Sequence, residues 1–298
     1  MTRRRPFDLG PFLYILPALA WYTLVVVYPT IQGFQLSTLE WTIFSDRTFV
    51  GLENYRRLFT ADSVFYGTVR NTALYVVVVV TIPIAVGVVL AVFIDGLANR
   101  RLSDFLRGLF FMPTILSVIA VGLIWGWFYN PHFGLLNALV GIVTGRPFVY
   151  GWLGETRTAL ASVMAVKIWM SVGFCMVVFL AGLRGIPEEY HEAAIIDGAR
   201  ARQRFFRITL PLLRPAFAVL LLVDTVDAFK EFTLVYVMTR GGPYRTTELM
   251  TTYMYDRAFV AWNLGYASTM GVVLFLLILV VSTGLRRVVE RLETGTGL

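Results

Sequence analysis

The sequence predicts an all-α integral membrane protein, with about six membrane-spanning helices in a single domain over residues 1–298. Of the 298 residues, 57% are hydrophobic and only 15% are charged, and the mean hydropathy is +0.69. These values are not those of a soluble globular domain. The apolar residues gather in six runs of roughly 20, the length that an α-helix needs to cross a bilayer. One long polar segment, residues 187–211, separates the fourth run from the fifth.

The six apolar runs are the expected spans, at about 12–31, 70–94, 108–128, 158–182, 213–237 and 267–286. The first run follows three arginines, Arg3, Arg4 and Arg5, and contains Ala18-Leu19-Ala20, so a cleaved signal peptide is an alternative interpretation. We reject it because hydrophobicity continues to Val27, whereas cleavage follows the apolar core. The further spans behind this run also argue against a twin-arginine signal.

Arginines are distributed unequally between the two sides of the membrane. If the N-terminus lies inside, the inner segments carry 15 arginines and the outer segments carry 9. Cytoplasmic loops of membrane proteins are enriched in such residues. We therefore expect both termini and residues 187–211 in the cytoplasm. Because the bases cluster at span ends, the net charge of +7 indicates membrane topology, with lipid as neighbour, and no nucleic-acid partner is expected.

The polar segment 187–211 reads as two short helices joined by a turn. Pro187 and the two glutamates after it suit the first turn of a helix. Residues 190–196 contain no breaker, and Gly198 can end this helix in the left-handed conformation. Residues 199–209 predict a second helix, which Pro211 stops or kinks. Such a segment is suited to docking into another protein. The alternative is an amphipathic helix on the lipid surface, with four arginines binding phosphates: Arg200, Arg202, Arg204 and Arg207.

This segment carries a family motif. Glu192-Ala193-Ala194, then three residues, Gly198, nine residues and Ile208-Thr209-Leu210-Pro211 resembles the EAA loop of ABC importer permeases. The resemblance implies a cytoplasmic coupling helix that docks into a cleft on an ATP-hydrolysing subunit. Small side chains at positions 193 and 194 let another backbone approach, and Glu192 offers a carboxylate. The residues expected to act in coupling are Glu192, Ala193, Ala194, Asp197, Gly198, Ile208, Leu210 and Pro211.

Further stretches are similar to the sugar-type permeases, the family of maltose, lactose and glycerol-phosphate importers. They cover nearly the whole chain and include Phe49-Val50-Gly51-Leu52-Glu53-Asn54-Tyr55, Asn71-Thr72, Phe128-Tyr129-Asn130-Pro131, Thr239-Arg240-Gly241-Gly242-Pro243 and Gly265-Tyr266-Ala267. The resemblance implies the type I ABC importer permease fold in a bacterial or archaeal cytoplasmic (inner) membrane. It also implies a second homologous permease, two ATPase subunits that bind ATP and Mg²⁺, and an extracytoplasmic solute-binding protein. The implied function is translocation of a sugar or related polyol by alternating access.

The fifth expected span contains four charged residues. At 100° per residue, Asp224, Asp227, Lys230 and Glu231 fall within an arc of about 120° on one helix face. Each charge at mid-bilayer costs roughly 2.5–3.5 kcal/mol, so this face must meet protein or water.

The charges have three interpretations, which the sequence leaves open. They line a pathway for a polar substrate together with Lys167 of the fourth span, or they form a neutralised structural network. In that network Asp227 pairs with Lys230, and Asp224 or Glu231 pairs with Lys167. The third interpretation is a gradient-driven secondary transporter that uses Asp224, Asp227 and Glu231 for ion coupling. Such transporters often show two similar halves, and this sequence shows none.

Two further groups of residues are candidates for contact with solute or partner. Trp169 is the leading candidate for stacking on a sugar face, although aromatics near span ends are more often packing or interface residues. The same holds for Trp125, Trp127, Phe128 and Phe174. Gly241-Gly242-Pro243 forms a tight turn just outside the fifth span. We expect it to belong to an external gate or to a docking surface for the solute-binding protein; the alternative is a plain connection.

Several classes of site are excluded by the sequence. It has no G-x-x-x-x-G-K-[ST] phosphate loop, and no lysine follows a glycine, so ATP hydrolysis is expected on a separate subunit. The single cysteine, Cys175, and the two distant histidines, His132 and His191, form no metal-binding pattern. No catalytic grouping stands out, so we expect neither an enzyme nor a cofactor in this chain. A further alternative is a membrane-anchored interaction protein with no transport role. The charges in the fifth span argue against it, because an inert anchor would not need them.

Overall fold

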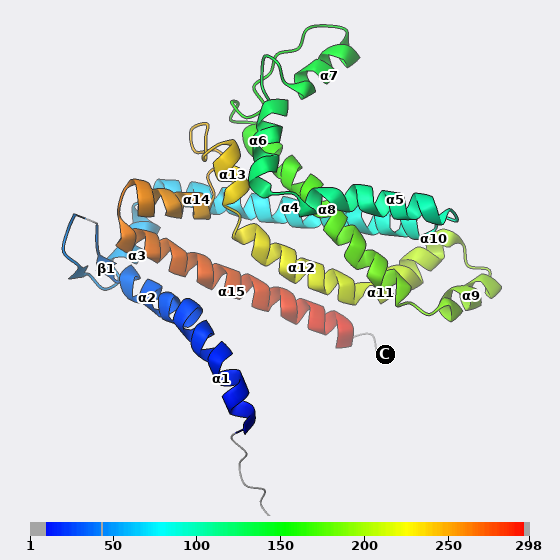
Figure 1. Ribbon diagram of the computed structural model, residues 1–298, viewed down its shortest axis with the longest axis horizontal. Helices are drawn as coiled ribbons and strands as arrows, with labels where there is room; N and C mark the ends of the chain where they lie inside the picture. The colour runs from blue at the N-terminus through cyan, green and yellow to red at the C-terminus, as the bar shows by residue number, and fades with distance from the viewer. Residues whose placement is uncertain (1–9, 43, 295–298) are drawn as a thin grey trace, which may run out of the picture. The chain divides into compact units, whose positions relative to one another are not determined.

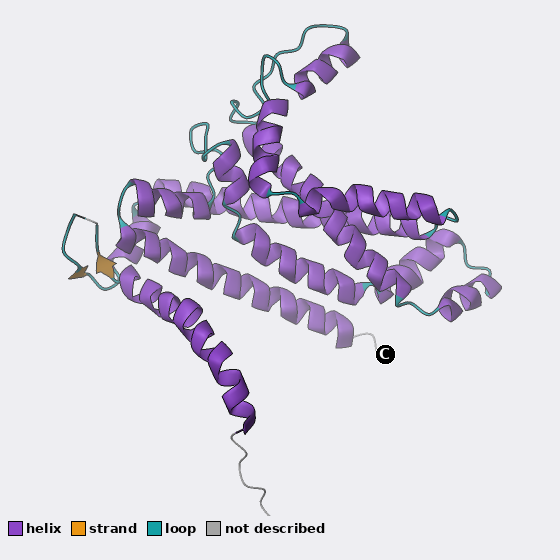
Figure 2. Ribbon diagram, in the orientation of Figure 1, coloured by secondary structure: helices purple, strands orange, loops and turns teal. Residues whose placement is uncertain are grey.

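The computed structural model describes residues 10–42 and 44–294. Arg3, Arg4 and Arg5, which contributed to the expected orientation, lie outside this range. Helices make up most of the described chain, which confirms the all-α prediction (Figures 1 and 2). The exception is a short antiparallel pair of strands, β1 (Leu39–Glu40) and β2 (Thr48–Phe49), in a region that the sequence left without regular structure.

Four helical segments are long and apolar enough to cross a bilayer: Tyr14–Ser37, Ser63–Asp95, Ala159–Arg184 and Leu264–Glu290. Two bent pairs pass the same test, Arg100–Ile115 with Val118–Phe128 at 98°, and Ala201–Leu212 with Arg214–Phe229 at 59°. If each bent pair is one span, the described residues contain up to six, the number that the apolar runs predict.

The chain divides into two compact units. The first unit combines the described residues up to Asp62 with residues Met254–Phe275, and the second combines Ser63–Tyr253 with the described residues from Leu276 to 294. The last long helix, α15 (Leu264–Thr294), therefore contributes to both.

Polar contacts hold the first unit together. It contains α1 (Gly10–Tyr22), a π-helical turn, α2 (Tyr28–Ser37), the two strands and α3 (Glu53–Thr60). The Asn54 side chain donates hydrogen bonds to the carbonyl oxygens of Ser37 (3.1 Å) and Leu39 (2.9 Å). The Thr269 hydroxyl of α15 also donates to the Ser37 carbonyl oxygen (3.1 Å). This last bond joins residues 232 positions apart in the sequence, so the unit combines segments that are distant along the chain.

The second unit is built around α4 (Ser63–Asp95) and α8 (Ala159–Arg184), which pack along each other. Glycines allow the close approach. A Cβ atom on Gly87 of α4 would lie 2.6 Å from the Cys175 Cβ atom of α8. A Cβ atom on Gly173 of α8 would lie 2.1 Å from the carbonyl oxygen of Phe110 in α5 (Arg100–Phe111). Small residues serve this purpose in membrane helix packing.

The third expected span is bent. After α5 the chain forms a 3₁₀ turn, Met112–Ile115, and then α6 (Val118–Phe128). Pro113 lies in this turn, where its missing N–H and its ring oppose a continuous helix. The loop that follows contains α7 (Leu135–Thr144), which the sequence analysis did not assign.

The remaining elements of the second unit begin in the polar segment. In chain order they are α9 (Glu188–Ile196), α10 (Ala201–Arg204), a π-helical turn at Phe205–Thr209, α11 (Leu210–Leu212), α12 (Arg214–Phe229), α13 (Thr233–Met238) and the start of α14 (Met250–Tyr255). The fifth expected span, 213–237, is thus divided between α12 and α13, with a break at residues 230–232.

Candidate functional site

The polar segment forms the two helices and the turn that the sequence predicts. Gly198 has a φ of +75°, in the left-handed region where glycine is favoured. Its N–H donates to the Ile195 carbonyl oxygen (3.0 Å), and the next N–H, of Ala199, donates to the Ala194 carbonyl oxygen (2.8 Å). This pair of bonds is the Schellman ending of a helix. The second helix is interrupted by the π-helical turn at Phe205–Thr209.

The helix α9 presents one face away from its own chain. Glu192, Ala193 and Ile196 are exposed on this face, and Ile196 is 86% exposed. Ala194 is only 8% exposed and packs inside the chain. The two alanines, which the sequence analysis treated alike, therefore have different surroundings. Asp197 and Gly198 are exposed, whereas Ile208, Leu210 and Pro211 are half-buried. Sequence reasoning missed Ile196, an apolar residue that would gain from burial if a partner covered this face.

The charged residues of the fifth span do not share one helix face. The helix α12 ends at Phe229, so that Lys230 and Glu231 lie in the break before α13. Glu231 explains the break locally. One of its carboxylate oxygens, Oε1, accepts the N–H of Leu234 in the first turn of α13 (3.0 Å), and its backbone carbonyl oxygen accepts the Thr251 hydroxyl. An acceptor at this position satisfies an N–H that the helix leaves free.

The ion pairs also differ from those that the sequence suggested. Lys167 Nζ lies 2.9 Å from Asp227 Oδ2 and 3.2 Å from Glu231 Oε2. Lys230 is exposed and makes no ion pair with any residue in the described part of the chain, so the pairing with Asp227 that the network interpretation assigned to it is not formed. Asp224 accepts a hydrogen bond from the Cys175 thiol at 3.4 Å instead of pairing with Lys167.

The two carboxylates on Lys167 have different environments. The Glu231 side chain is 7% exposed, whereas the Asp227 side chain is 61% exposed. Lys167 is mostly buried between them. We call Lys167, Asp227 and Glu231 the charge cluster. It has one buried carboxylate that also bonds to the backbone of α13, and one exposed carboxylate that a second molecule can reach.

Trp169, the leading aromatic candidate, lies on another side of α8 from the charge cluster. The Trp169 ring contacts Trp125 of α6, with the ring centroids 5.6 Å apart. Residues two positions apart in an α-helix point in nearly opposite directions, so Trp169 faces away from Lys167. Trp127 is exposed, while Trp125 also contacts Phe128 and Tyr129. Burial raises the pKa of Tyr129 to about 12, and its hydroxyl donates to the Ser162 carbonyl oxygen (3.0 Å).

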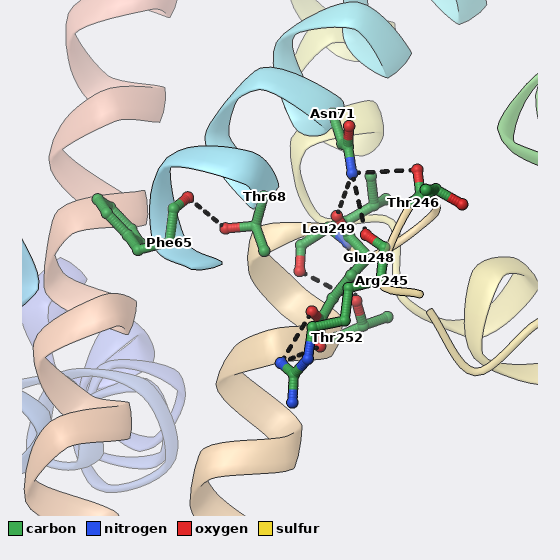
Figure 3. A network of polar contacts seen from close by, with 8 residues as sticks. All are labelled: Phe65, Thr68, Asn71, Arg245, Thr246, Glu248, Leu249 and Thr252. Carbon is green, nitrogen blue, oxygen red and sulfur yellow. Dashed lines mark hydrogen bonds and ion pairs between the residues drawn. The ribbon is translucent and has the colours of Figure 1, made fainter. Parts of the chain in front are cut away.

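The turn at Gly241-Gly242-Pro243 belongs to a loop that α4 holds in place. Figure 3 shows Asn71 of α4 pointing into this loop, where its amide donates to the carbonyl oxygens of Arg245 (3.4 Å), Thr246 (3.1 Å) and Glu248 (3.1 Å). The next residue, Thr72, accepts the Met250 N–H with its hydroxyl (3.0 Å). The Asn71-Thr72 pair, noted above only for its resemblance, is therefore the clamp of this loop.

The loop is also stiffened from within. Thr247 donates to the Gly242 carbonyl oxygen (2.8 Å). Arg245 forms an ion pair with Glu248 at 3.1 Å (Figure 3). Three residues without the freedom of glycine, Arg240, Tyr244 and Arg245, have positive φ angles. Such conformations persist where the surroundings enforce them. The Tyr244 side chain is 92% exposed.

Comparison with known proteins identifies the family. The model of the "binding-protein-dependent transport system inner membrane component" matches residues 84–294. The chain belongs to this family. The permease is 36% identical over 273 residues to the probable ABC transporter permease protein YurN of Bacillus subtilis, covering 91% of this chain and 93% of that protein. It is 35% identical over 305 residues to the diacetylchitobiose uptake system permease protein NgcF of Streptomyces coelicolor, covering 98% of this chain and 86% of that protein.

A solved structure supports the fold. The permease matches a chain of a bacterial ABC transporter involved in the import of the acidic polysaccharide alginate, with a TM-score of 0.85 and 20% identity over 95% of this chain and 96% of that chain. The type I importer permease fold is thereby confirmed, and the protein is the permease subunit of a binding-protein-dependent ABC importer in a membrane.

Proposed function

We propose that this permease moves a sugar or related polyol across the cytoplasmic membrane, driven by ATP hydrolysis on a separate subunit. The observation that carries the proposal is the complete EAA motif on a helix whose outward face is exposed and partly apolar. The resemblance to sugar-type permeases and the similarity to a diacetylchitobiose permease support a sugar as the solute.

The coupling surface is the outward face of α9. Glu192, Ala193 and Ile196 fit a cleft on an ATPase, because an alanine permits close approach beside an apolar side chain that gains from burial. Gly198 fixes the direction of the chain that leaves this helix. When the ATPase dimer closes on ATP and Mg²⁺, α9 moves as a lever, and Ile208, Leu210 and Pro211 pass the motion to α12.

The solute pathway includes the exposed part of the charge cluster. Asp227 accepts hydrogen bonds from solute hydroxyls, while Lys167 and the buried Glu231 hold it in position. Lys230 and Asp224 are further polar groups near this surface, and Trp169 offers a ring on the α6 side of α8. The difference in exposure between Asp227 and Glu231 supports this division of roles.

The loop around Gly241-Gly242-Pro243 acts on the outer side of the membrane, as a gate or as a docking surface for the solute-binding protein. Its many internal bonds support this proposal, because a rigid loop loses less entropy on binding than a mobile one. The orientation follows from the arginines, and both termini are in the cytoplasm. The complete importer contains a second homologous permease and two ATPase subunits.

The composition of the complex tests the proposal. The tagged chain is solubilised in mild detergent from its native membrane and purified, and the proteins that accompany it are identified by mass spectrometry. We expect an ATPase, a second six-span protein and a soluble binding protein. Recovery of the chain alone would contradict the proposal and favour the gradient-driven alternative, which family membership leaves without support.

A further inference from the structure

The short helix α7 has its polar and apolar faces reversed relative to a helix on the surface of a soluble protein. Asn137, a polar residue on its inner face, is 4% exposed. The outer face carries Leu135, Leu139, Ile142 and Val143, of which the last two are 77% and 86% exposed. An amphipathic helix in water shows the opposite arrangement.

The inner face is fixed by hydrogen bonds. The Asn137 amide donates to the carbonyl oxygens of Pro131 (2.9 Å) and Tyr150 (3.0 Å), and its Oδ1 atom accepts the indole N–H of Trp152 (2.7 Å). These three bonds join both ends of the loop to the helix. The helix therefore has no freedom to rotate its apolar side chains inward, and their exposure is a property of the fold.

The apolar stripe follows helical spacing. Residues 135, 139 and 142 lie four and three positions apart, and Ala138 and Val143 flank them on the same face. The only polar residue of the helix besides Asn137 is Thr144. It lies on the side opposite the apolar stripe, and its hydroxyl donates to the Val140 carbonyl oxygen (2.8 Å). A contiguous apolar surface of this kind marks a contact with another molecule or a membrane.

The surface continues an exposed apolar side of α6, which belongs to the third expected span. In α6, Ile119, Leu123 and Trp127 are all more than half exposed and lie four residues apart. Only residues 129–134 separate the end of α6 from α7, and Figure 1 shows α7 beyond that end, away from the other helices of the second unit. Trp127 marks the level of the membrane interface, where tryptophan is enriched.

Charge distinguishes a lipid neighbour from a protein neighbour. Residues 130–154 contain no acidic residue, and their one permanent cation, Arg146, lies exposed beside the helix and lines a shallow cleft together with His132. The exposed side chains of the stripe are all aliphatic, whereas the centres of protein interfaces are enriched in aromatic residues, methionine and arginine. Ten residues are too few to span a bilayer; an apolar helix of about this length is a core helix or an interfacial segment, and the exposure of Ile142 and Val143 disfavours a core helix.

We propose that α7 lies flat in the membrane interface at the end of α6, with Leu135, Leu139, Ile142 and Val143 among the acyl chains and Arg146 at the lipid phosphates. The helix anchors the loop between the third and fourth spans at a fixed depth. The aliphatic stripe supplies binding through buried apolar area, as in other helices that lie on membranes.

Spin labels measure the depth of this helix directly. Leu139→Cys and Ile142→Cys variants are labelled with a nitroxide in the full chain, purified with the subunits that accompany it and placed in lipid nanodiscs. Thr144→Cys is the matched control on the opposite face of the same helix. The native Cys175 is buried, so the unsubstituted chain carried through the same labelling measures the background. Collision rates with oxygen, which concentrates in lipid, are compared with those of a water-soluble nickel chelate.

The ratio of oxygen to nickel collisions is expected to be several-fold higher at positions 139 and 142 than at position 144. High nickel accessibility at 139 and 142 would mean that the stripe faces water and would overturn the proposal. Protection of both labels from oxygen and from nickel, with strongly immobilised spectra, would mean that another protein covers the stripe and would overturn it equally.

Discussion

Removal of the Lys167 ammonium tests the role of the charge cluster. In Lys167→Met the buried Glu231 carboxylate loses its ion pair at 3.2 Å, while Asp227 loses a partner but remains 61% exposed to other neighbours. A buried charge left without its partner costs about 3–5 kcal/mol, and a broken pair at an exposed carboxylate costs about 0–1 kcal/mol. The loss of compensation for the buried charge is the larger effect, so the stability lost in Lys167→Met comes mainly from Glu231.

This division predicts the behaviour of three variants. Lys167→Met should lower the thermal stability of the detergent-solubilised chain strongly. Adding Glu231→Gln should restore much of it, because no unpaired charge is then buried and the side-chain oxygen of the introduced glutamine still accepts the Leu234 N–H. Asp227→Asn should change stability little but reduce solute uptake. The assay is the temperature at which half of the fluorescently tagged protein remains monodisperse in size-exclusion chromatography.

Two outcomes would contradict this expectation: a Lys167→Met variant as stable as the unsubstituted chain, or a double variant less stable than Lys167→Met. Either result would mean that Glu231 does not depend on Lys167 for compensation. A loss of stability in Asp227→Asn as large as that in Lys167→Met would contradict the division of roles within the cluster.

Three further predictions concern backbone positions and the loop clamp. Gly198→Pro should leave ATPase activity but abolish uptake, because proline requires a φ near −65° where the chain has +75°; normal uptake would count against the lever. Gly173→Ala should lower thermal stability by forcing α8 away from Phe110, at a cost of about 1–3 kcal/mol. Gly108→Ala is the control, because no atom lies within 4 Å of its Cβ position, and it should not lower stability. Equal stability of the two variants would refute the packing argument. Asn71→Ala should cost about 1–3 kcal/mol of local stability and speed hydrogen exchange in residues 244–249, and unchanged exchange there would show that Asn71 is not the clamp.

The coupling segment could be predicted from the sequence because its signals are local. Proline and glutamates begin α9, and Gly198 ends it in the left-handed conformation that the sequence indicates. Spacing within one short segment also carries the family motif. The exposure of Ile196 and the burial of Ala194 were not predicted, since they depend on which face the rest of the chain covers.

The charge cluster could be predicted only in part. Apolar context and the cost of burial indicated that Lys167 meets carboxylates of the fifth span, and Glu231 was one candidate. The pairing of Asp227 with Lys230 was wrong because it assumed a continuous helix. Neither glycine nor proline marks the break at residues 230–232. It is stabilised by Thr251, which lies 20 residues further along the chain.

The loop clamp and α7 show a different limit of sequence reasoning. Asn71 lies at the start of an apolar run, and nothing local indicates that its amide reaches carbonyl oxygens 174 to 177 residues away. In α7, the apolar residues suggest a helix with a core-facing side, but the three bonds to Asn137 decide which face is inside. Both features depend on contacts that lie outside the local sequence pattern.

Uptake into proteoliposomes distinguishes ATP-driven transport from transport driven by an ion gradient. The copurified complex is reconstituted so that the side that carries α9 and the ATPase faces the added ATP. Transport of a labelled solute is then measured with the binding protein on the opposite side. We expect uptake that requires both ATP and the binding protein and does not respond to dissipation of proton or sodium gradients. Uptake driven by an ion gradient without ATP would contradict it.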